Sequence, residues 1–442
     1  MGGGKSSDYF LTNSYTADEH PIRHLSEAEK IVYVNAVGEL ISTLPHEKKR
    51  LRLAFSIWIH SLGICQAICS NPPTHKFLFL RKANDIFGFT PNNQNLCIAI
   101  AFDFLVTVEK VLGDASTYMP VVTASLNGNT QWTLRLHYAF TLLKGDIELK
   151  GDIESCKLPP ELLAQWRKEQ SFAHQREKRV VFAATMSAGK STLINAIVGH
   201  KINEVRATAC TSHVHYIHNK LHDSGAMARF DHDKYVYTDN YHLLCSEVIE
   251  AASLNFNSNL RGERICLIDT PGVNFSGDNS HRKMTYSTID SNDFDILVVV
   301  LNSQQLAICD ECDFIRYISH TCKHKVIFAL NKLDCFNPED GDSIEEAMLY
   351  ARQMTDECGI ENPTIIPVSG MGAFLIRQQR KQVPSLTESD KHSLRWIRQL
   401  AETGYFNLPR YAGFDKTNED DDKLLWLTGV PLLENVIIDN LK

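Results

Sequence analysis

The chemistry of this chain centres on residues 179–199, which read RVVFAATMSAGKSTLINAIVG. The apolar run 180–182 predicts a buried strand, the small residues at 184–189 predict a loop, and the letters KST at 190–192 open a predicted helix. Strand, loop, helix and a GK[ST] ending are the context of a phosphate-binding loop, or P-loop. Small residues let backbone N–H groups turn toward phosphate oxygens, and the helix N-terminus adds partial positive charge.

The candidate contacts to phosphate and metal lie at the end of this loop. Lys190 is expected to reach the β- and γ-phosphates of a nucleoside triphosphate, and the Ser191 hydroxyl is expected to hold Mg²⁺. The first glycine of the GxxxxGK[ST] pattern is replaced by Ala184, which the strand-like end of the loop tolerates. The predicted nucleotide-binding residues here are Ala188, Gly189, Lys190, Ser191 and Thr192.

A second motif, Asp269-Thr270-Pro271-Gly272, follows the apolar run 265–268. Asp269 is expected to bind the Mg²⁺ shell through water, and the Gly272 amide is expected to contact the γ-phosphate. A loop of this kind changes conformation when the γ-phosphate leaves.

The third motif predicts which base is bound. Asn331-Lys332-Leu333-Asp334 follows the apolar residues 328–330. The Asp334 carboxylate can accept two hydrogen bonds from the N1–H and N2–H₂ edge of guanine, a donor pair that adenine lacks. The aliphatic part of Lys332 is expected to pack along the base. Asn331 is also a predicted nucleotide-binding residue. The ligands predicted are therefore GTP and GDP rather than ATP.

The elements that must position these motifs are parallel strands. Apolar strands are predicted at 179–183, 264–268, 295–301, 325–330 and 364–368, and predicted helices alternate with them. Nearly continuous hydrophobicity is typical of strands buried on both faces, and ligands bind at the carboxyl ends of such strands. The fold class predicted is an α/β P-loop GTPase, a G domain with a mostly parallel sheet. After the last strand, Ser369 and Gly370 resemble the loop whose backbone amide reads guanine O6.

The first 170 residues predict an α-helical domain instead. Ser26 and Glu29 form a capping box, and helices are expected over about 47–69, 92–113, 131–146 and 159–177. We expect a flexible N-terminus at 1–25, an α-helical domain of unknown role at 26–177, and the G domain at 178–442. The apolar stretches 54–69 and 96–108 fall short of the ~18–20 clean residues of a spanning helix, although either could contact a membrane peripherally.

Composition limits the classes of protein that fit. The chain has 442 residues, 43% of them hydrophobic, which is enough for two or three domains with ample cores. The net charge of −8 argues against general nucleic-acid binding. Twelve scattered cysteines in a chain of this size indicate reduced thiols and a cytoplasmic protein.

The ordered motifs resemble those of the dynamin superfamily, in particular bacterial dynamin-like GTPases. The resemblance lies in Ser187 to Ala196, SAGKSTLINA, in the DTPG motif, and in the long spacing from Lys190 to Asp269. It implies a switch I threonine, for which Thr211 is favoured and Thr208 is second, as a ligand of Mg²⁺ and γ-phosphate. It also implies an insertion at about 375–425 before a last helix near 430.

The resemblance further implies how GTP would be cleaved. The family uses the P-loop serine, here Ser187, with a monovalent cation and a partner G domain, so a homodimer through G domains is expected. The alternative is that Ser187 only shapes the loop. Met186 stands where the family has glutamine, and Val273 after Gly272 leaves no Ras-type glutamine to orient water. No helical stalk follows the G domain, so we expect paired G domains without a coat.

Other functions remain open. The alternative to a dynamin-like switch or mechanochemical GTPase is an Era-like regulatory GTPase that binds a protein or RNA partner, or a nucleotide-binding scaffold with little turnover. The histidines and cysteines at 309–324 have zinc-like spacing, but a helix over 310–319 explains them without metal. His213 and His215 are expected on the solvent face of a half-solvated edge strand over 211–217 rather than as metal ligands.

Overall fold

The computed structural model describes most of the chain and divides it into two compact units. The first unit comprises residues 1–175 with 222–224, and the second comprises 176–221 with 225–442. The residues described are 20, 22, 25–42, 44, 48–61, 91–112, 115–125, 134–138, 141, 160–203, 213–223, 225–231, 234–238, 241, 244, 249–273, 279–381, 386–414 and 423–442.

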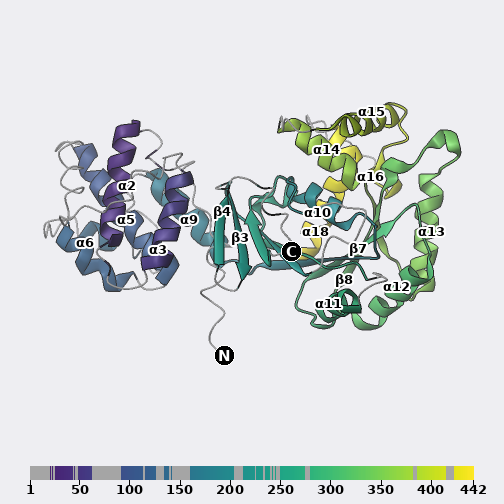
Figure 1. Cartoon of the computed structure of the whole chain (residues 1–442), viewed down its shortest axis with the longest axis horizontal. Coiled ribbons are helices and arrows are strands. Elements are labelled where there is room, and N and C mark those ends of the chain that lie inside the picture. Colours follow the sequence, from purple (N-terminus) through teal and green to yellow (C-terminus); the bar gives the residue numbers. More distant parts are fainter. Residues whose placement is uncertain are drawn as a thin grey trace. The chain divides into compact units, whose positions relative to one another are not determined.

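The regular secondary structure among the described residues of the first unit is all helical, as predicted (Figure 1). Its helices are α2 (Glu27–Ser42), α3 (Lys48–Ser61), α5 (Pro91–Leu112), α6 (Met119–Ser125) and α9 (Pro160–His174), with the 3₁₀ turn η3 (Ser116–Tyr118). The predicted capping box starts α2: the Ser26 amide donates to Glu29 Oε2 at 2.8 Å, and the Glu29 amide donates to Ser26 Oγ at 3.4 Å. Among the described residues, no helix combines the length and the hydrophobicity that crossing a bilayer requires.

A buried carboxylate interrupts the apolar face of α5. Asp103 is 2% exposed, and its Oδ2 accepts a hydrogen bond from the Tyr33 hydroxyl at 2.6 Å and lies 2.9 Å from His20 Nε2. A buried carboxylate needs such partners because desolvation otherwise disfavours its charge. The predicted apolar stretch 96–108 therefore lies within a helix whose buried carboxylate has polar partners at Oδ2.

The second unit is built on a mostly parallel sheet, and this part of the fold prediction is confirmed. Among the described residues the sheet has nine strands in the order β4-β3-β5-β2-β6-β1-β7-β8-β9. The five pairings β1–β6, β1–β7, β2–β5, β7–β8 and β8–β9 are parallel. The strands are β1 (Lys178–Ala184), β2 (His215–Asn219), β3 (Ala226–Asp231), β4 (Lys234–Thr238), β5 (Ala251–Leu254), β6 (Ile265–Asp269), β7 (Ile296–Asn302), β8 (Lys325–Asn331) and β9 (Thr364–Pro367).

Helices cover both faces of this sheet. Alternate residues of β1 point into two separate cores: Val180 and Phe182 into one, Val181 and Ala183 into the other. Helices α10 (Lys190–Val198), α14 (Gly370–Arg380) and α18 (Val430–Leu441) pack in the first core, and α11 (Asn279–Asp290), α12 (Cys309–Thr321) and α13 (Ile344–Glu357) pack in the second (Figure 1). Burial on both faces explains why these strands are apolar at nearly every position.

Three further helices and three 3₁₀ turns are described in the second unit. These are α15 (Glu388–Glu402), α16 (Leu408–Tyr411) and α17 (Lys423–Leu427), with 3₁₀ turns η5 (Asn259–Gly262), η6 (Leu333–Cys335) and η7 (Pro338–Asp340). The last helix, α18, begins after Gly429, whose φ of 72° places it in the left-handed region that favours glycine. A buried ion pair fixes α18 to α14: Arg377 Nη1 lies 2.8 Å from Glu434 Oε1.

The prediction of a half-solvated edge strand at 211–217 is wrong. Strand β2 begins only at His215 and lies inside the sheet, between β5 and β6. His215 is 8% exposed, whereas His213 precedes the strand and is exposed. The physical reason is that residues 226–254 supply β3, β4 and β5, which extend the sheet beyond β2.

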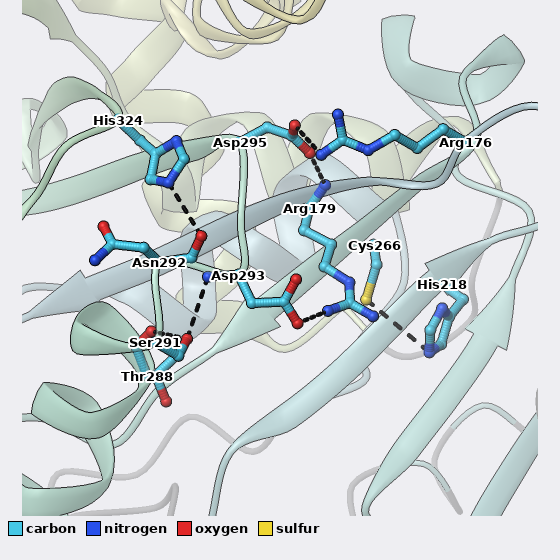
Figure 2. A network of polar contacts seen from close by, with 10 residues as sticks. All are labelled: Arg176, Arg179, His218, Cys266, Thr288, Ser291, Asn292, Asp293, Asp295 and His324. Atoms are coloured by element: carbon cyan, nitrogen blue, oxygen red, sulfur yellow. Dashed lines mark hydrogen bonds and ion pairs between the residues drawn. The ribbon is translucent and has the colours of Figure 1, made fainter. Parts of the chain in front are cut away.

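A polar network lies at the amino-terminal ends of β1, β6 and β7, as Figure 2 shows. Asp295, just before β7, accepts hydrogen bonds from the Arg179 amide at 2.8 Å and from Arg176 Nη2 at 2.7 Å. Arg179 also pairs with Asp293. The network fixes the start of the central strand at the end opposite to its P-loop.

Candidate functional site

The P-loop adopts the geometry that its small residues predict. Ala184 is the last residue of β1, so its methyl group is accommodated as expected, and Lys190 begins α10. Gly189 has a φ of +83°, and a Cβ at this position would collide with Asn331 Nδ2. Glycine is therefore required there by both the backbone conformation and the space. Ser187 is exposed with a φ of 63°, a strained conformation for a non-glycine residue that is characteristic of functional loops.

The predicted phosphate and metal residues converge at the carboxyl end of β6. The Lys190 ammonium forms an ion pair with Asp269 Oδ1, and the Ser191 hydroxyl donates to Asp269 Oδ2 at 3.3 Å. Lys190 is 7% exposed and Asp269 is fully buried. A buried lysine needs a negative partner, because desolvation otherwise disfavours its charge. Phosphate oxygens can replace the carboxylate in that role.

The donor set at this point suits Mg²⁺. Ser191 Oγ and the Asp269 carboxylate are hard oxygen ligands, 3.3 Å apart, which is the type of donor that Mg²⁺ prefers. The predicted third ligand, Thr211, and its alternative Thr208 lie outside the described residues. Thr192, also predicted to contact the nucleotide, is 7% exposed in the first turn of α10.

The DTPG motif runs directly against the P-loop. The Thr270 hydroxyl donates to the Phe182 carbonyl at 2.9 Å, and the Val273 amide donates to the Ala184 carbonyl at 3.2 Å. A Cβ on Gly272 would lie 3.4 Å from Met186 Cα. Gly272 thus lies beside the P-loop, the position that its predicted γ-phosphate contact requires.

Asn331 connects the P-loop to the loop after β9. Its Nδ2 donates to the Ala188 carbonyl at 3.0 Å, and its Oδ1 accepts from the Gly370 amide at 2.9 Å. A Cβ on Gly370 would lie only 3.2 Å from the Leu193 amide nitrogen, so the close approach favours glycine. Lys332 follows with a φ of 69°, a second strained position in the site.

The side chain of Asp334 is hydrogen-bonded to Ser369, a residue that the sequence also predicts to lie near the base. Ser369 Oγ donates to Asp334 Oδ1 at 2.6 Å and itself accepts from the Gly372 amide. Burial raises the pKa of Asp334, while the hydrogen bond from Ser369 opposes this shift. The indole N–H of Trp396 donates to the Asp334 carbonyl at 3.2 Å.

Sequence reasoning missed three buried polar residues beside Asp269. Asn203 Nδ2 donates to Asp269 Oδ2 at 2.9 Å, and Asn203 Oδ1 lies 2.9 Å from His215 Nδ1. Asn195 Oδ1 accepts from the Asn203 amide at 3.0 Å, and Asn195 Nδ2 donates to the Asn203 carbonyl at 2.9 Å. One signal was visible: Asn195 is a lone amide among the apolar residues of α10.

His215 is neutral in this setting. Burial lowers its pKa to about 4; Asp269 opposes the shift, while His218 and Lys190 add to it. His218, at the other end of β2, forms the only cluster of potential metal-ligating side chains in the described part of the chain, together with Glu177 and Cys266. Both of its ring nitrogens are engaged there, since Nδ1 lies 2.8 Å from Glu177 Oε1 and Nε2 lies 4.0 Å from Cys266 Sγ.

The mostly parallel sheet and the strand-end motifs define a P-loop GTPase domain. More narrowly, residues 180–333 match the sequence profile described as the dynamin family. A G domain of this family binds guanine nucleotide and hydrolyses GTP. No curated protein sequence matches the chain.

Solved structures give weaker likenesses. Two are from work on an oligomerised bacterial dynamin pair that senses and tethers membranes; identities are 14% and 15%, TM-scores 0.35 and 0.37. The matches cover 88% and 97% of this chain and 72% and 63% of those chains. A third is Era in complex with MgGDPNP and a ribosomal RNA fragment, at 15% identity and a TM-score of 0.29, covering 48% of this chain and 56% of that one. The likeness to the dynamin family therefore rests on the profile match over 180–333.

Proposed function

We propose that this chain binds GTP with Mg²⁺ and hydrolyses it to GDP and phosphate, acting as a dynamin-type nucleotide switch. The observation that carries the proposal is the convergence of Lys190 and Ser191 on Asp269. The amide of Asn331 supports it, because it joins the P-loop to the loop beside Asp334.

Phosphoryl transfer needs positioning and charge stabilisation more than covalent chemistry. Lys190 exchanges its ion pair with Asp269 for the β- and γ-phosphates and neutralises charge on the transferred group. Ser191, Asp269 and the predicted Thr211 would hold Mg²⁺, which would supply a Lewis acid for the phosphate oxygens. Ser187, exposed at the turn of the loop, orients the attacking water from its hydroxyl.

Guanine selection is assigned to Asp334. Ser369 donates to Oδ1 of this carboxylate and the Cys335 thiol donates weakly to Oδ2 at 3.8 Å, which leaves one lone pair on each oxygen to accept from guanine N1–H and N2–H₂. An unpaired buried acceptor is costly, so adenine is disfavoured. The backbone amides of Ser369 and Gly370 already donate to the Thr428 carbonyl at 2.8 Å and to Asn331 Oδ1 at 2.9 Å, so a contact with O6 of the base requires one of them to leave its partner.

The guanine selectivity assigned to Asp334 can be tested by substitution. Asp334→Asn keeps an oxygen for Ser369 but presents an N–H₂ donor outward, so it is expected to lose guanine nucleotides and gain xanthine nucleotides, whose C2 carries an acceptor oxygen. Binding is measured by calorimetry with GDP, ADP and xanthosine diphosphate. Equal affinity of the wild type for GDP and ADP would overturn guanine selection.

Lys190 provides the test of the phosphate site. Lys190→Ala is expected to abolish GTP binding and turnover, whereas Lys391→Ala, which removes an exposed lysine paired with Glu388, is expected to change neither. Turnover that survives in Lys190→Ala at the wild-type rate would contradict the proposal.

Activation through paired G domains is the finer part of the proposal. Specific GTPase activity is expected to rise with protein concentration and to be lost with Ser187→Ala. Liposomes added to the same assay report peripheral membrane contact by co-sedimentation. A rate that does not vary with concentration favours a solitary, Era-like regulatory GTPase with a protein or RNA partner, and binding without turnover favours a scaffold.

A further inference from the structure

A polar chain behind the metal site carries an inference that the dynamin-family motifs do not contain. Asn203 and His215 are both 8% exposed, and neither belongs to the P-loop, DTPG or NKLD motifs. His215 Nδ1 and Asn203 Oδ1 form a hydrogen bond with each other, and the side-chain Nδ2 of Asn203 donates to Asp269 Oδ2. The side chain of Asp269 is thus contacted from α10, from residue 203 and, through residue 203, from β2.

The directions of these hydrogen bonds follow from the donors available. Asp269 Oδ2 can only accept from Asn203, so the Nδ2 amino group of Asn203 faces the carboxylate and its Oδ1 faces His215. His215 Nδ1 must then carry the proton and donate. A flip of the amide would place an oxygen against the carboxylate and an N–H₂ group against an N–H donor. His215 therefore locks the amide in the orientation that suits Asp269.

The backbone of residue 203 is fixed as well. Asn195 Oδ1 accepts from the amides of Ile202 and Asn203, and Asn195 Nδ2 donates to the Asn203 carbonyl. Asn195 is on α10, the helix that the P-loop opens. The chain of contacts thus runs from the P-loop helix to Asp269 without passing through Lys190.

We propose that Asn203 and His215 are positioning residues that hold the Asp269 carboxylate in place for Mg²⁺ after Lys190 has moved to the phosphates. In the structure Lys190 occupies Oδ1, and Asn203 and Ser191 occupy Oδ2. When Lys190 leaves, the Asn203 amide keeps one oxygen fixed and hydrogen-bonded. Partners of this kind, which orient a metal ligand from behind, commonly change metal affinity about 10–100-fold when removed. This inference rests on the proposed GTP site.

The test separates nucleotide binding from its dependence on Mg²⁺. A fluorescent, non-hydrolysable GTP analogue is bound first in EDTA, then its dissociation rate is measured as MgCl₂ is raised. In EDTA, Asn203→Leu is expected to bind the analogue as tightly as the wild type does. It is expected to need about 10-fold more Mg²⁺ to reach half of the maximal decrease in the dissociation rate. Wild-type protein that binds no guanine nucleotide defeats the proposed function itself, whereas intact binding with an unchanged Mg²⁺ requirement in Asn203→Leu overturns only this inference.

His215 provides a matched pair of variants should Asn203→Leu not fold. His215→Leu removes the donor and is expected to raise the Mg²⁺ requirement roughly 3-fold. His215→Asn replaces the Nδ1–H donor with an amide N–H and is expected to restore the wild-type requirement. Equal Mg²⁺ curves for the two variants would contradict the positioning role.

A control distinguishes positioning from general loosening of the fold. Asn255 is a second buried amide of the same unit, 7% exposed, and its Nδ2 donates to the Lys220 carbonyl at 2.7 Å. Asn255→Leu is expected to lower thermal stability and to leave the Mg²⁺ requirement unchanged. A shift in Asn255→Leu as large as that in Asn203→Leu would overturn the inference.

Discussion

Two buried histidines on one strand meet opposite electrostatic conditions. His215 and His218 are both 8% exposed and lie three positions apart in β2. Each faces a residue of β6 in the antiparallel register: His215 pairs with Asp269, and His218 pairs with Cys266. Yet the pKa of His215 is lowered to about 4, and that of His218 is raised to about 10.

The difference lies in what the facing acidic group is already bound to. Burial alone lowers the pKa of both imidazoles. At His218 the charge of Cys266 and hydrogen bonds to Cys266 and Glu177 outweigh burial. At His215 the Asp269 charge is already shared with Lys190 and Asn203, so burial prevails. A facing carboxylate therefore does not by itself protonate a histidine.

His218→Leu is expected to have the largest effect on stability. It leaves Glu177 and Cys266 without their buried cationic partner, and removal of one member of such a set costs about 3–5 kcal/mol. The measurement is urea unfolding at pH 7, with His215→Leu as the control at about 1 kcal/mol, since only a neutral hydrogen bond is lost there. Equal losses would remove the distinction between the two histidines.

The pH dependence of stability should separate the two sites next. His218 has a pKa that is raised on folding, so its stabilisation is full below pH 6.5 and is lost as pH rises toward about 10. Cys266, Glu177 and Arg179 are the titratable or charged groups around it. Wild-type unfolding free energy should therefore fall over this window more steeply than that of His218→Leu. Parallel curves would show that His218 is neutral in the folded protein.

For His215 the opposite dependence of stability on pH is expected, at acidic pH. Its pKa is lowered on folding, so the unfolded chain takes up a proton that the folded chain refuses, and stability falls as pH drops from 6.5 to about 4. Asp269, Lys190 and His218 are the charged groups that face it. Because His215→Asn keeps the hydrogen bond but cannot titrate, its loss of stability over this window should be smaller than that of the wild type. An unchanged acidic limb would argue against a neutral His215.

The smallest effect on stability is expected at the exposed ion pair between Arg179 and Asp293, which lies near His218 and Cys266. Arg179 pairs with Asp293, as Figure 2 shows. The side chain of Asp293 is 74% exposed. Exposed ion pairs contribute about 0–1 kcal/mol and are screened by salt. Asp293→Asn should therefore lower stability by less than about 1 kcal/mol, and 1 M NaCl should abolish the difference. A loss of unfolding free energy as large as that of His218→Leu would show that Asp293 contributes as much to stability as the buried His218 does.

Much of the fold was predictable because it depends on local pattern. The strands that precede the DTPG and NKLD motifs are apolar on both faces, and β6 and β8 lie within a residue or so of the ranges that hydrophobicity predicted. The motifs follow these strands, so their meeting at one edge of the sheet follows from parallel pairing. The same reasoning failed at β2. Strands β3, β4 and β5 are short and partly polar, and without them β2 would be an edge.

The sequence by itself determined the order of strand, loop and helix around the P-loop, and it indicated which residues are predicted to hold phosphate, metal and base. These depend on neighbours within a few positions of each other. Only the tertiary structure decided that Asn203 contacts Asp269 across 66 positions, and that two histidines of the same strand carry different charges. The reason is that a pKa and a hydrogen bond depend on the charges and donors nearby in space, and here the sheet brings them from distant segments.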